Sequence, residues 1–179
     1  MKRMEELFNI KLYGEFTPYI QASEDKRIYF FTDSFEGRKH SLLKLVEFLF
    51  NGDSQIDTTF LKAYIPKGFG KPLRSEKQVL HGRIQIKNWN EFYYTESEFG
   101  TTYIFATVKD IKSTGVFEYI RSIMKGEKAQ LISFYNDNYF ITVDSDEITV
   151  IVKDVGLLNE LKVFLKDLNY NRFCDPFEN

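Results

Sequence analysis

The order of apolar and polar residues predicts a chain that mixes strands and helices. In the first third, residues 11–20 are predicted as a strand with a turn around Gly14 and Pro18, and residues 58–65 as another strand. Residues 27–33 form a run of aromatic and branched side chains, which is typical of a strand buried on both faces. Between these strands, Ser41 is placed to cap a helix and Gly52 to end it. The apolar positions of that helix form one stripe (Leu42, Leu43, Leu45, Val46, Leu49 and Phe50).

The same plan returns 74 residues later. The helix stripe of residues 42–50 falls on a second stripe (Val116, Phe117, Tyr119, Ile120, Ile123 and Met124), and Gly52 falls on Gly126. The alignment needs no gap from Ile10 to Phe60, and eight of its 51 positions are identical. We interpret this agreement as an internal duplication, with two related β-β-α-β units. The alternative is that any two such units look alike once their stripes are aligned.

The second unit is predicted to continue beyond the repeat. Residues 129–135 and 139–144 are expected as strands joined by a hairpin turn at Asn136-Asp137-Asn138, followed by a strand at 147–153. Asp154 is placed to cap a C-terminal helix, whose stripe is Leu157, Leu158, Leu161, Phe164, Leu165 and Leu168.

The predicted fold class is therefore α+β, with a first unit at 1–66, a connector at 67–81 and a second unit at 82–179. A unit of about 70 residues buries little core alone, so we expect the two to pack as one compact domain with a seam between them. Fusion of the two sheets into one continuous sheet is the other arrangement.

Composition and charge narrow the class of protein. Apolar residues make up 43% of the 179 and charged residues 28%, which excludes a disordered or fibrous chain. The formal charge is −2, yet residues 62–87 carry seven Lys or Arg against Glu76 alone. Because the flanking regions are acidic, most of the surface would repel phosphates, which argues against nucleic acid as a partner. The basic connector is expected to be a solvated loop, or else a contact loop for an acidic partner with Phe69 as its anchor.

The sequence also gives expectations about location. The single cysteine, Cys174, cannot form an internal disulfide, which fits a reducing cytosol. Acidic residues occur within the first six positions and no apolar run follows them, unlike in a signal peptide. No apolar stretch approaches the length that is needed to span a bilayer. We therefore expect a cytoplasmic protein with no signal peptide and no membrane partner.

No grouping of residues predicts catalysis or a cofactor. Gly68-Phe69-Gly70-Lys71 has the wrong spacing for a phosphate loop. No Gly-x-Ser-x-Gly motif provides an activated serine with which His40 or His81 could form a catalytic pair, and Cys174 lies in a polar tail. The acidic run 144–147 lacks the glycine and distal glutamate of a calcium loop, so we interpret it as a solvated turn. The prediction is no catalytic residue, no metal and no cofactor.

Aromatic strand segments are interpreted mainly as core. Stacking on RNA would require Lys or Arg between the rings, whereas acidic residues such as Glu91 and Asp137 neighbour them. Some of the tyrosines are still expected to line a protein-binding face, because Tyr combines a large contact area with a polar tip.

The leading hypothesis is a non-catalytic, cytosolic protein-binding module, in concrete form a small inhibitor or immunity-type protein that masks a basic partner such as a nuclease. Its expected contact residues are Lys67, Phe69, Lys71, Arg74, Tyr93, Tyr94, Asp137 and Tyr139. The alternative is a small-molecule-binding domain or enzyme with its site in the seam, for which the residues to watch are His40, Asp33, Lys71 and Arg74. A self-associating structural protein is a third possibility.

Overall fold

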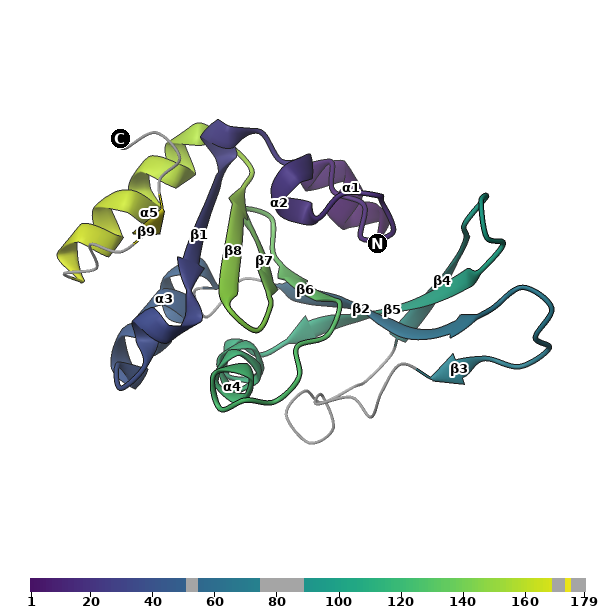
Figure 1. Cartoon of the computed structure of the whole chain (residues 1–179). Coiled ribbons are helices and arrows are strands. Elements are labelled where there is room, and N and C mark those ends of the chain that lie inside the picture. The colour runs from purple at the N-terminus through teal and green to yellow at the C-terminus, as the bar shows by residue number, and fades with distance from the viewer. Residues whose placement is uncertain (51–54, 75–88, 169–172, 175–179) are drawn as a thin grey trace.

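The computed structural model describes residues 1–50, 55–74, 89–168 and the backbone of 173–174 (Figure 1). Its α-helices are α1 (Lys2–Phe8), α2 (Pro18–Gln21), α3 (Lys39–Leu49), α4 (Ser113–Met124) and α5 (Val155–Asp167), and two short 3₁₀ helices are η1 (Glu24–Lys26) and η2 (Thr32–Phe35). Its strands are β1 (Arg27–Phe31), β2 (Ile56–Ile65), β3 (Leu73–Arg74), β4 (Trp89–Thr95), β5 (Thr102–Ile111), β6 (Ile132–Tyr135), β7 (Tyr139–Val143), β8 (Glu147–Val152) and β9 (Phe173–Cys174).

All strands of the described segments belong to one nine-stranded sheet. Its order is β4-β5-β2-β6-β7-β8-β1-β9, with β3 paired to β2, and every pairing is antiparallel. The α+β class is therefore confirmed. The two predicted units do not form separate sheets, because β2 of the first lies between β5 and β6 of the second. The continuous sheet is the arrangement that the chain adopts.

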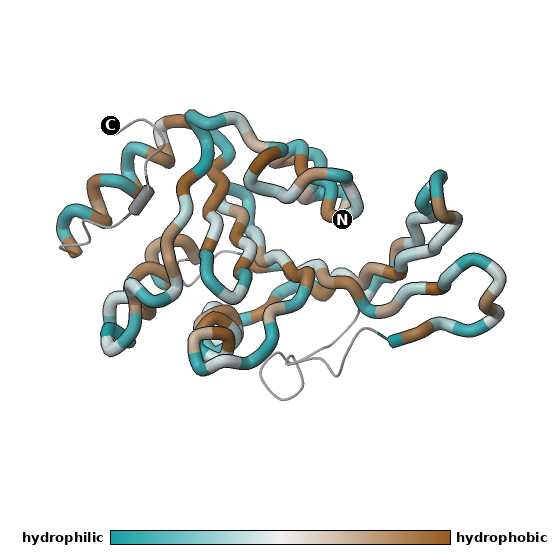
Figure 2. The backbone as a smooth tube through the Cα atoms, viewed as in Figure 1, coloured by the Kyte–Doolittle hydropathy of each residue, from teal (hydrophilic) through white to brown (hydrophobic). Residues whose placement is uncertain are grey.

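Helices cover both faces of this sheet (Figure 1). On one face, α3, α4 and α5 bury their apolar stripes in the larger of two core clusters, and Phe48 of α3 stacks on Phe164 of α5 with ring centroids 4.2 Å apart. On the other face, Met4 and Phe8 of α1 pack against Phe105 and Phe140. Figure 2 shows hydrophobic positions recurring along the helices and the central strands, which is the pattern that burial of these two layers requires.

Several predicted helix ends can be compared directly. Asp154 accepts a hydrogen bond from the Leu157 amide at 3.2 Å, which confirms it as the cap of α5. Gly126 follows α4 with a φ of 88°, where a side chain would be strained. The first long helix begins at Lys39 rather than after Ser41, and Arg38 before it makes no side-chain cap. Gly52 lies outside the described residues.

The strand predicted at residues 11–20 is wrong. The Gln21 side chain accepts a hydrogen bond from the Lys11 amide at 2.8 Å and donates one to the Lys11 carbonyl at 2.9 Å. These two bonds satisfy the backbone groups of Lys11 that a neighbouring strand would otherwise pair. Pro18 begins the short helix α2, a position where its missing N–H costs nothing.

The helices of the structure follow the predicted 74-residue repeat, but equivalent strands of the two units have different neighbours in the sheet. Moved by 74 residues, the bounds of α3 become 113–123, which matches α4. An even number of antiparallel pairings separates β1 from β2 in the sheet, and the same is true of β5 and β6, so each of these two pairs runs parallel. Helices α3 and α4 therefore each connect two parallel strands. However, β1 lies between β8 and β9, whereas β5 lies between β4 and β2. The fold by itself therefore does not establish a duplication.

The C-terminal end of β2 and the N-terminal end of β5 extend beyond the part of the sheet that the helices cover, which we call the body. β6 pairs with β2 only as far as Phe60, and a β-bulge between Leu61 and Ala63 then interrupts the register with β5. A bulge bends the strand and increases its twist. Figure 1 shows these ends projecting away from the body together with β3 and β4. We call residues 61–74 and 89–106 the arm.

Candidate binding surface on the arm

The arm contains six of the eight contact residues that the sequence predicts. Lys67, Phe69 and Lys71 lie in the β2–β3 connection and Arg74 in β3, all of them exposed. Tyr93 and Tyr94 lie in β4. These residues come from segments separated by 19 to 27 positions in the sequence, and the sheet brings them to one projecting element. The rest of the predicted connector, residues 75–81 with His81, lies outside the described residues.

The other two predicted contact residues lie away from the arm. Tyr139 is only 6% exposed and packs near Phe48, so its ring belongs to the core and is not on the surface. Burial raises the pKa of Tyr139 to about 12. Asp137 has 72% of its side chain exposed in the β6–β7 turn, but its carboxylate is held by Arg3 at 2.8 Å. The sequence placed Tyr139 on a surface because alternation alone does not show that α3 and α5 cover its face of the sheet.

One face of the arm carries a row of tyrosines. Tyr64 lies opposite both Leu73 and Tyr103 in neighbouring strands, and Tyr103 lies opposite Tyr94. Residues directly opposite each other share one face of a sheet, so these four side chains form a row across four strands. Tyr13, from the loop after α1, stacks on Tyr94 with ring centroids 4.3 Å apart. We call Tyr13, Tyr64, Tyr94 and Tyr103 the tyrosine face.

The tyrosine face is partly desolvated and bordered by carboxylates. Burial, and next to it the charge of Glu5, raises the pKa of Tyr13. Burial, and then the charge of Glu96, raises the pKa of Tyr103. Both carboxylates are half-buried, and neither forms an ion pair with another residue in the described ranges. The face therefore combines aromatic area with two carboxylates that form no ion pair among the described residues.

The opposite face of the arm has a different chemistry. Trp89, Glu91 and Tyr93 alternate along β4 and so share this face. The Lys62 ammonium pairs with the Glu91 carboxylate and lies 4.9 Å from the centroid of the Trp89 ring. The Tyr93 hydroxyl donates to the other Glu91 oxygen at 2.8 Å. On this face Glu91 is thus already neutralised by the protein's own lysine.

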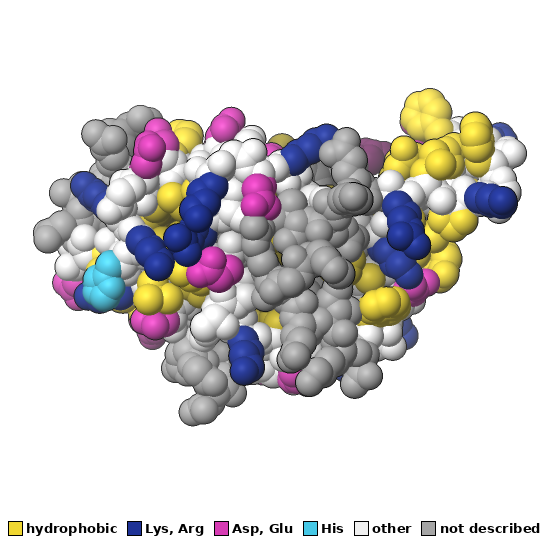
Figure 3. Space-filling model, turned by 90° about the horizontal axis from the view of Figure 1, so that it is seen from below, with side chains coloured by type: hydrophobic (Ala, Val, Ile, Leu, Met, Phe, Trp, Pro, Cys, Tyr) yellow, Lys and Arg dark blue, Asp and Glu magenta, His cyan; other side chains and the backbone are white. Residues whose placement is uncertain are grey.

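Large apolar side chains are exposed along the whole arm. Six residues contribute them: Phe69, Leu73, Trp89, Phe92, Tyr93 and Phe99. Phe69 and Phe99, each 62% exposed, lie in the two loops at the end of the arm. Figure 3 shows hydrophobic and Lys or Arg side chains gathered over the arm. Clustered exposure of this kind marks interaction surfaces, whereas apolar residues exposed singly do not.

A second surface feature is an acidic groove of about 620 Å³ between η2, the end of α4 and the β7–β8 turn. Its carboxylates are Asp33, Glu36, Glu127, Asp144 and Asp146, against Lys128. The Ser145 carbonyl accepts a hydrogen bond from the Thr32 hydroxyl at 3.0 Å, which ties η2 to the turn. Within the described residues no group of three or more His, Cys, Asp or Glu side chains is arranged to hold a metal ion.

The residues watched for the enzyme alternative do not form one site. Asp33 lines the acidic groove, and His40 lies exposed in the first turn of α3. Lys71 and Arg74 lie on the arm. The set of four that the sequence offered for catalysis is therefore divided between the body and the arm.

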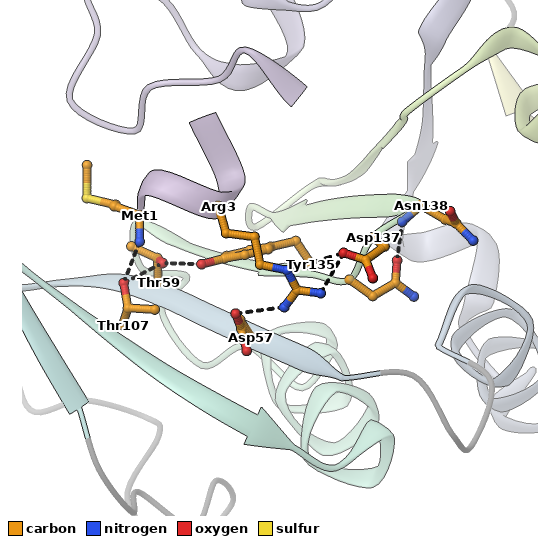
Figure 4. Close-up of polar contacts among 9 residues, drawn as sticks. Met1, Arg3, Asp57, Thr59, Thr107, Tyr135, Asp137 and Asn138 are labelled. Carbon is orange, nitrogen blue, oxygen red and sulfur yellow. Dashed lines mark hydrogen bonds and ion pairs between the residues drawn. The ribbon is translucent and has the colours of Figure 1, made fainter. Parts of the chain in front are cut away.

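A buried ion-pair network holds α1 on the sheet (Figure 4). Arg3 donates to Asp57, whose side chain is 2% exposed, and to Asp137, both at 2.8 Å. The Thr59 hydroxyl contacts the Thr107 hydroxyl at 2.9 Å and the Tyr135 hydroxyl at 3.2 Å. The network fixes the segment that positions Tyr13 at the tyrosine face, and sequence reasoning missed it because Arg3 is 54 residues from Asp57 and 134 residues from Asp137.

Comparison with protein-family models, with curated proteins and with solved structures finds no match to this chain. In the described part of the chain, no helix has both the length and the apolar character needed to cross a membrane.

Proposed function

We propose that this protein is a protein-binding module of the inhibitor or immunity type, which masks a basic partner in the cytosol. The observation that carries the proposal is the tyrosine face, an aromatic surface on a projecting arm with the carboxylates of Glu5 and Glu96 at its border. Tyr, Trp and Arg are the residues that most often dominate binding energy at protein interfaces. The tyrosine face supplies the first type, and the opposite face of the arm exposes all three, at Tyr93, Trp89 and Arg74.

Charge at the tyrosine face itself supports a basic partner, whereas the exposed cations of the arm (Lys67, Lys71 and Arg74) lie in the β2–β3 connection and β3. Glu5 and Glu96 border the tyrosine face, and the acidic groove adds five more carboxylates on the body. A field of one sign steers an oppositely charged protein during its approach and raises the association rate. The acidic groove is a candidate site for the small-molecule alternative, but its lining includes Asp33 and none of the other three residues watched for it.

The proposal is tested by titrating the purified protein against a panel of basic nucleases and acidic control proteins, with calorimetry as the readout. A stoichiometric complex with a basic member is expected. The double variant Tyr94→Ser/Tyr103→Ser should weaken it at least about tenfold, because it removes two central aromatic contacts. Val163→Ser, which removes a 60% exposed apolar side chain from α5 on the body, is the control and should have no effect. Equal binding by the double variant would refute the tyrosine face as the contact surface.

We also infer that the two β-α-β segments share an origin. Support comes from the coincidence of α3 and α4 at an offset of 74 residues, and from the parallel strands that each helix connects. Superposition of β1-α3-β2 on β5-α4-β6 is the test, and a best fit that shifts the helices out of the 74-residue register would contradict the inference.

A further inference from the structure

We propose that the tyrosine face binds an arginine side chain of an extended partner segment, with the guanidinium stacked on Tyr103 and paired with Glu96. This inference rests on the proposed function and names the chemistry of the partner at that same surface.

The protein already contains one such arrangement in its own fold. The Arg27 guanidinium carbon lies 4.1 Å from the centroid of the Tyr19 ring, and the same guanidinium is 3.5 Å from the Glu24 carboxylate. Its Nη1 group donates to the backbone carbonyls of Tyr19 and Ala22. An aromatic ring and a carboxylate together hold a guanidinium, because its flat faces stack and its edge donates.

The tyrosine face offers an aromatic ring and a carboxylate without the arginine. Tyr103 is half-buried, with Tyr94 opposite it on the neighbouring strand. Glu96 lies two residues after Tyr94, and its amide donates to the Thr101 carbonyl at 2.9 Å, so Glu96 and Tyr103 are diagonal neighbours across the β4–β5 pair. Next to burial, the Glu96 charge raises the pKa of Tyr103, and Glu96 forms no ion pair among the described residues. A half-buried carboxylate beside an aromatic ring is stabilised by a cation that contacts both.

The geometry favours an extended segment. The row from Leu73 to Tyr94 crosses four strands, and neighbouring strands lie about 4.8 Å apart, so the row is about 14 Å long. An extended peptide advances about 3.3 Å per residue, so four or five residues follow the whole row. With Glu96 near Tyr103 and Glu5 near Tyr13, carboxylates border the face at two places. Phosphate groups would be repelled there, which favours a cationic peptide over a nucleic acid.

The test is fluorescence anisotropy with a labelled ten-residue peptide in which Arg alternates with Pro. Three probes of the same length serve as comparisons: a Lys–Pro peptide, a Glu–Pro peptide and an oligothymidylate. The Arg–Pro peptide is expected to bind at least about fivefold more tightly than the Lys–Pro peptide, since only the guanidinium stacks and donates in one plane. The Glu–Pro peptide and the oligothymidylate should not bind.

Variants locate the contact. Glu96→Gln should weaken Arg–Pro binding at least about fivefold, and Tyr103→Leu should do the same, whereas Tyr103→Phe keeps the ring and should retain most of the affinity. Glu160→Gln, an exposed carboxylate on α5, is the matched control and should leave binding unchanged. Equal affinity for the Arg and Lys peptides, no loss in Glu96→Gln, or preferential binding of the oligothymidylate would each overturn the inference. A basic protein that still needs Tyr94 and Tyr103, while the peptide fails to bind, would overturn it and leave the proposed function standing.

Discussion

Removal of the Arg3 guanidinium should destabilise the fold far more than loss of an ordinary surface charge. Asp57 has only 2% of its side chain exposed, and Arg3 donates to its Oδ2 atom at 2.8 Å. The other oxygen, Oδ1, has no hydrogen-bond partner among the described residues. The substitution Arg3→Met keeps much of the apolar stem and leaves a buried carboxylate without the cation that compensates it.

The magnitude follows from the exposure of the two partners. Removing one member of a fully buried pair costs about 3–5 kcal/mol. Arg3 is 27% exposed, so water can enter and replace part of the interaction, and we expect a loss of about 2–3 kcal/mol. The second pair, from Arg3 to the 72% exposed Asp137, adds about 0–1 kcal/mol.

Urea unfolding of a double-mutant cycle measures this coupling. Arg3→Met, Asp57→Asn and the double variant are compared with the parent chain, and Asp137→Asn is the control for the exposed pair. Because Asn at 57 carries no charge, the two substitutions should not be additive. The free energy of unfolding lost in the double variant should be smaller than the sum of the two single losses by at least about 1 kcal/mol. A loss below about 0.5 kcal/mol for Arg3→Met, or simple additivity, would refute the reasoning.

Three further predictions concern the core and the arm. Leu45→Asp and Tyr119→Asp should each cost more than about 3 kcal/mol, because both positions are at most 1% exposed in the same cluster, and a mild effect of either in thermal unfolding would contradict this. The stability contributed by three core tyrosines (Tyr119, Tyr135 and Tyr139) should be fully present up to about pH 10 and fall as the pH rises towards 12, because burial raises their pKa to about 12. Below pH 10 each of these tyrosines contributes up to about 2–3 kcal/mol to the free energy of unfolding, and this contribution is lost on ionisation. A midpoint of urea unfolding that does not change between pH 9 and 12 would exclude the effect. Serine at the three exposed cations of the arm (Lys67, Lys71 and Arg74) should leave the melting temperature unchanged, since they form no ion pair within the described residues.

Much of the fold was predictable because it depends on local signals. The stripes at 42–50 and 116–124 predicted α3 and α4, Asp154 predicted the start of α5, and the turn at residues 136–138 predicted the β6–β7 hairpin. The order of strands was not predictable, because pairing of β2 with both β5 and β6 depends on which apolar faces meet after the chain collapses. The segment at 11–20 was predicted wrongly because the Gln21 side chain, rather than a strand, satisfies the Lys11 backbone.

The candidate site was predictable only in part. Basic residues with few acidic neighbours identified the β2–β3 hairpin, and the aromatic run at 92–94 identified β4. Tyr64 and Tyr103 were missed, since an aromatic residue in a strand gives the same pattern whether a helix covers it or not. Tyr13 was missed because residues 11–20 were predicted as a strand, whereas Tyr13 lies in the loop after α1. The length of the strands was the available signal: β2 and β5 are ten residues long, whereas their neighbour β6 has four.

The size of α1 explains why the tyrosine face remains open. A seven-residue helix is about 10 Å long, and α1 is anchored over the body by Arg3 and by burial of Met4 and Phe8. On the sheet face beneath it, Phe105 is 1% exposed, whereas Tyr103, two residues farther along β5, is only half-buried. Successive same-face residues of a strand are about 6.6 Å apart, so one such step carries the row beyond the reach of the helix. Among the described residues, covering Tyr64, Tyr94 and Tyr103 would therefore need a longer α1, and this is the position that the proposed partner would occupy.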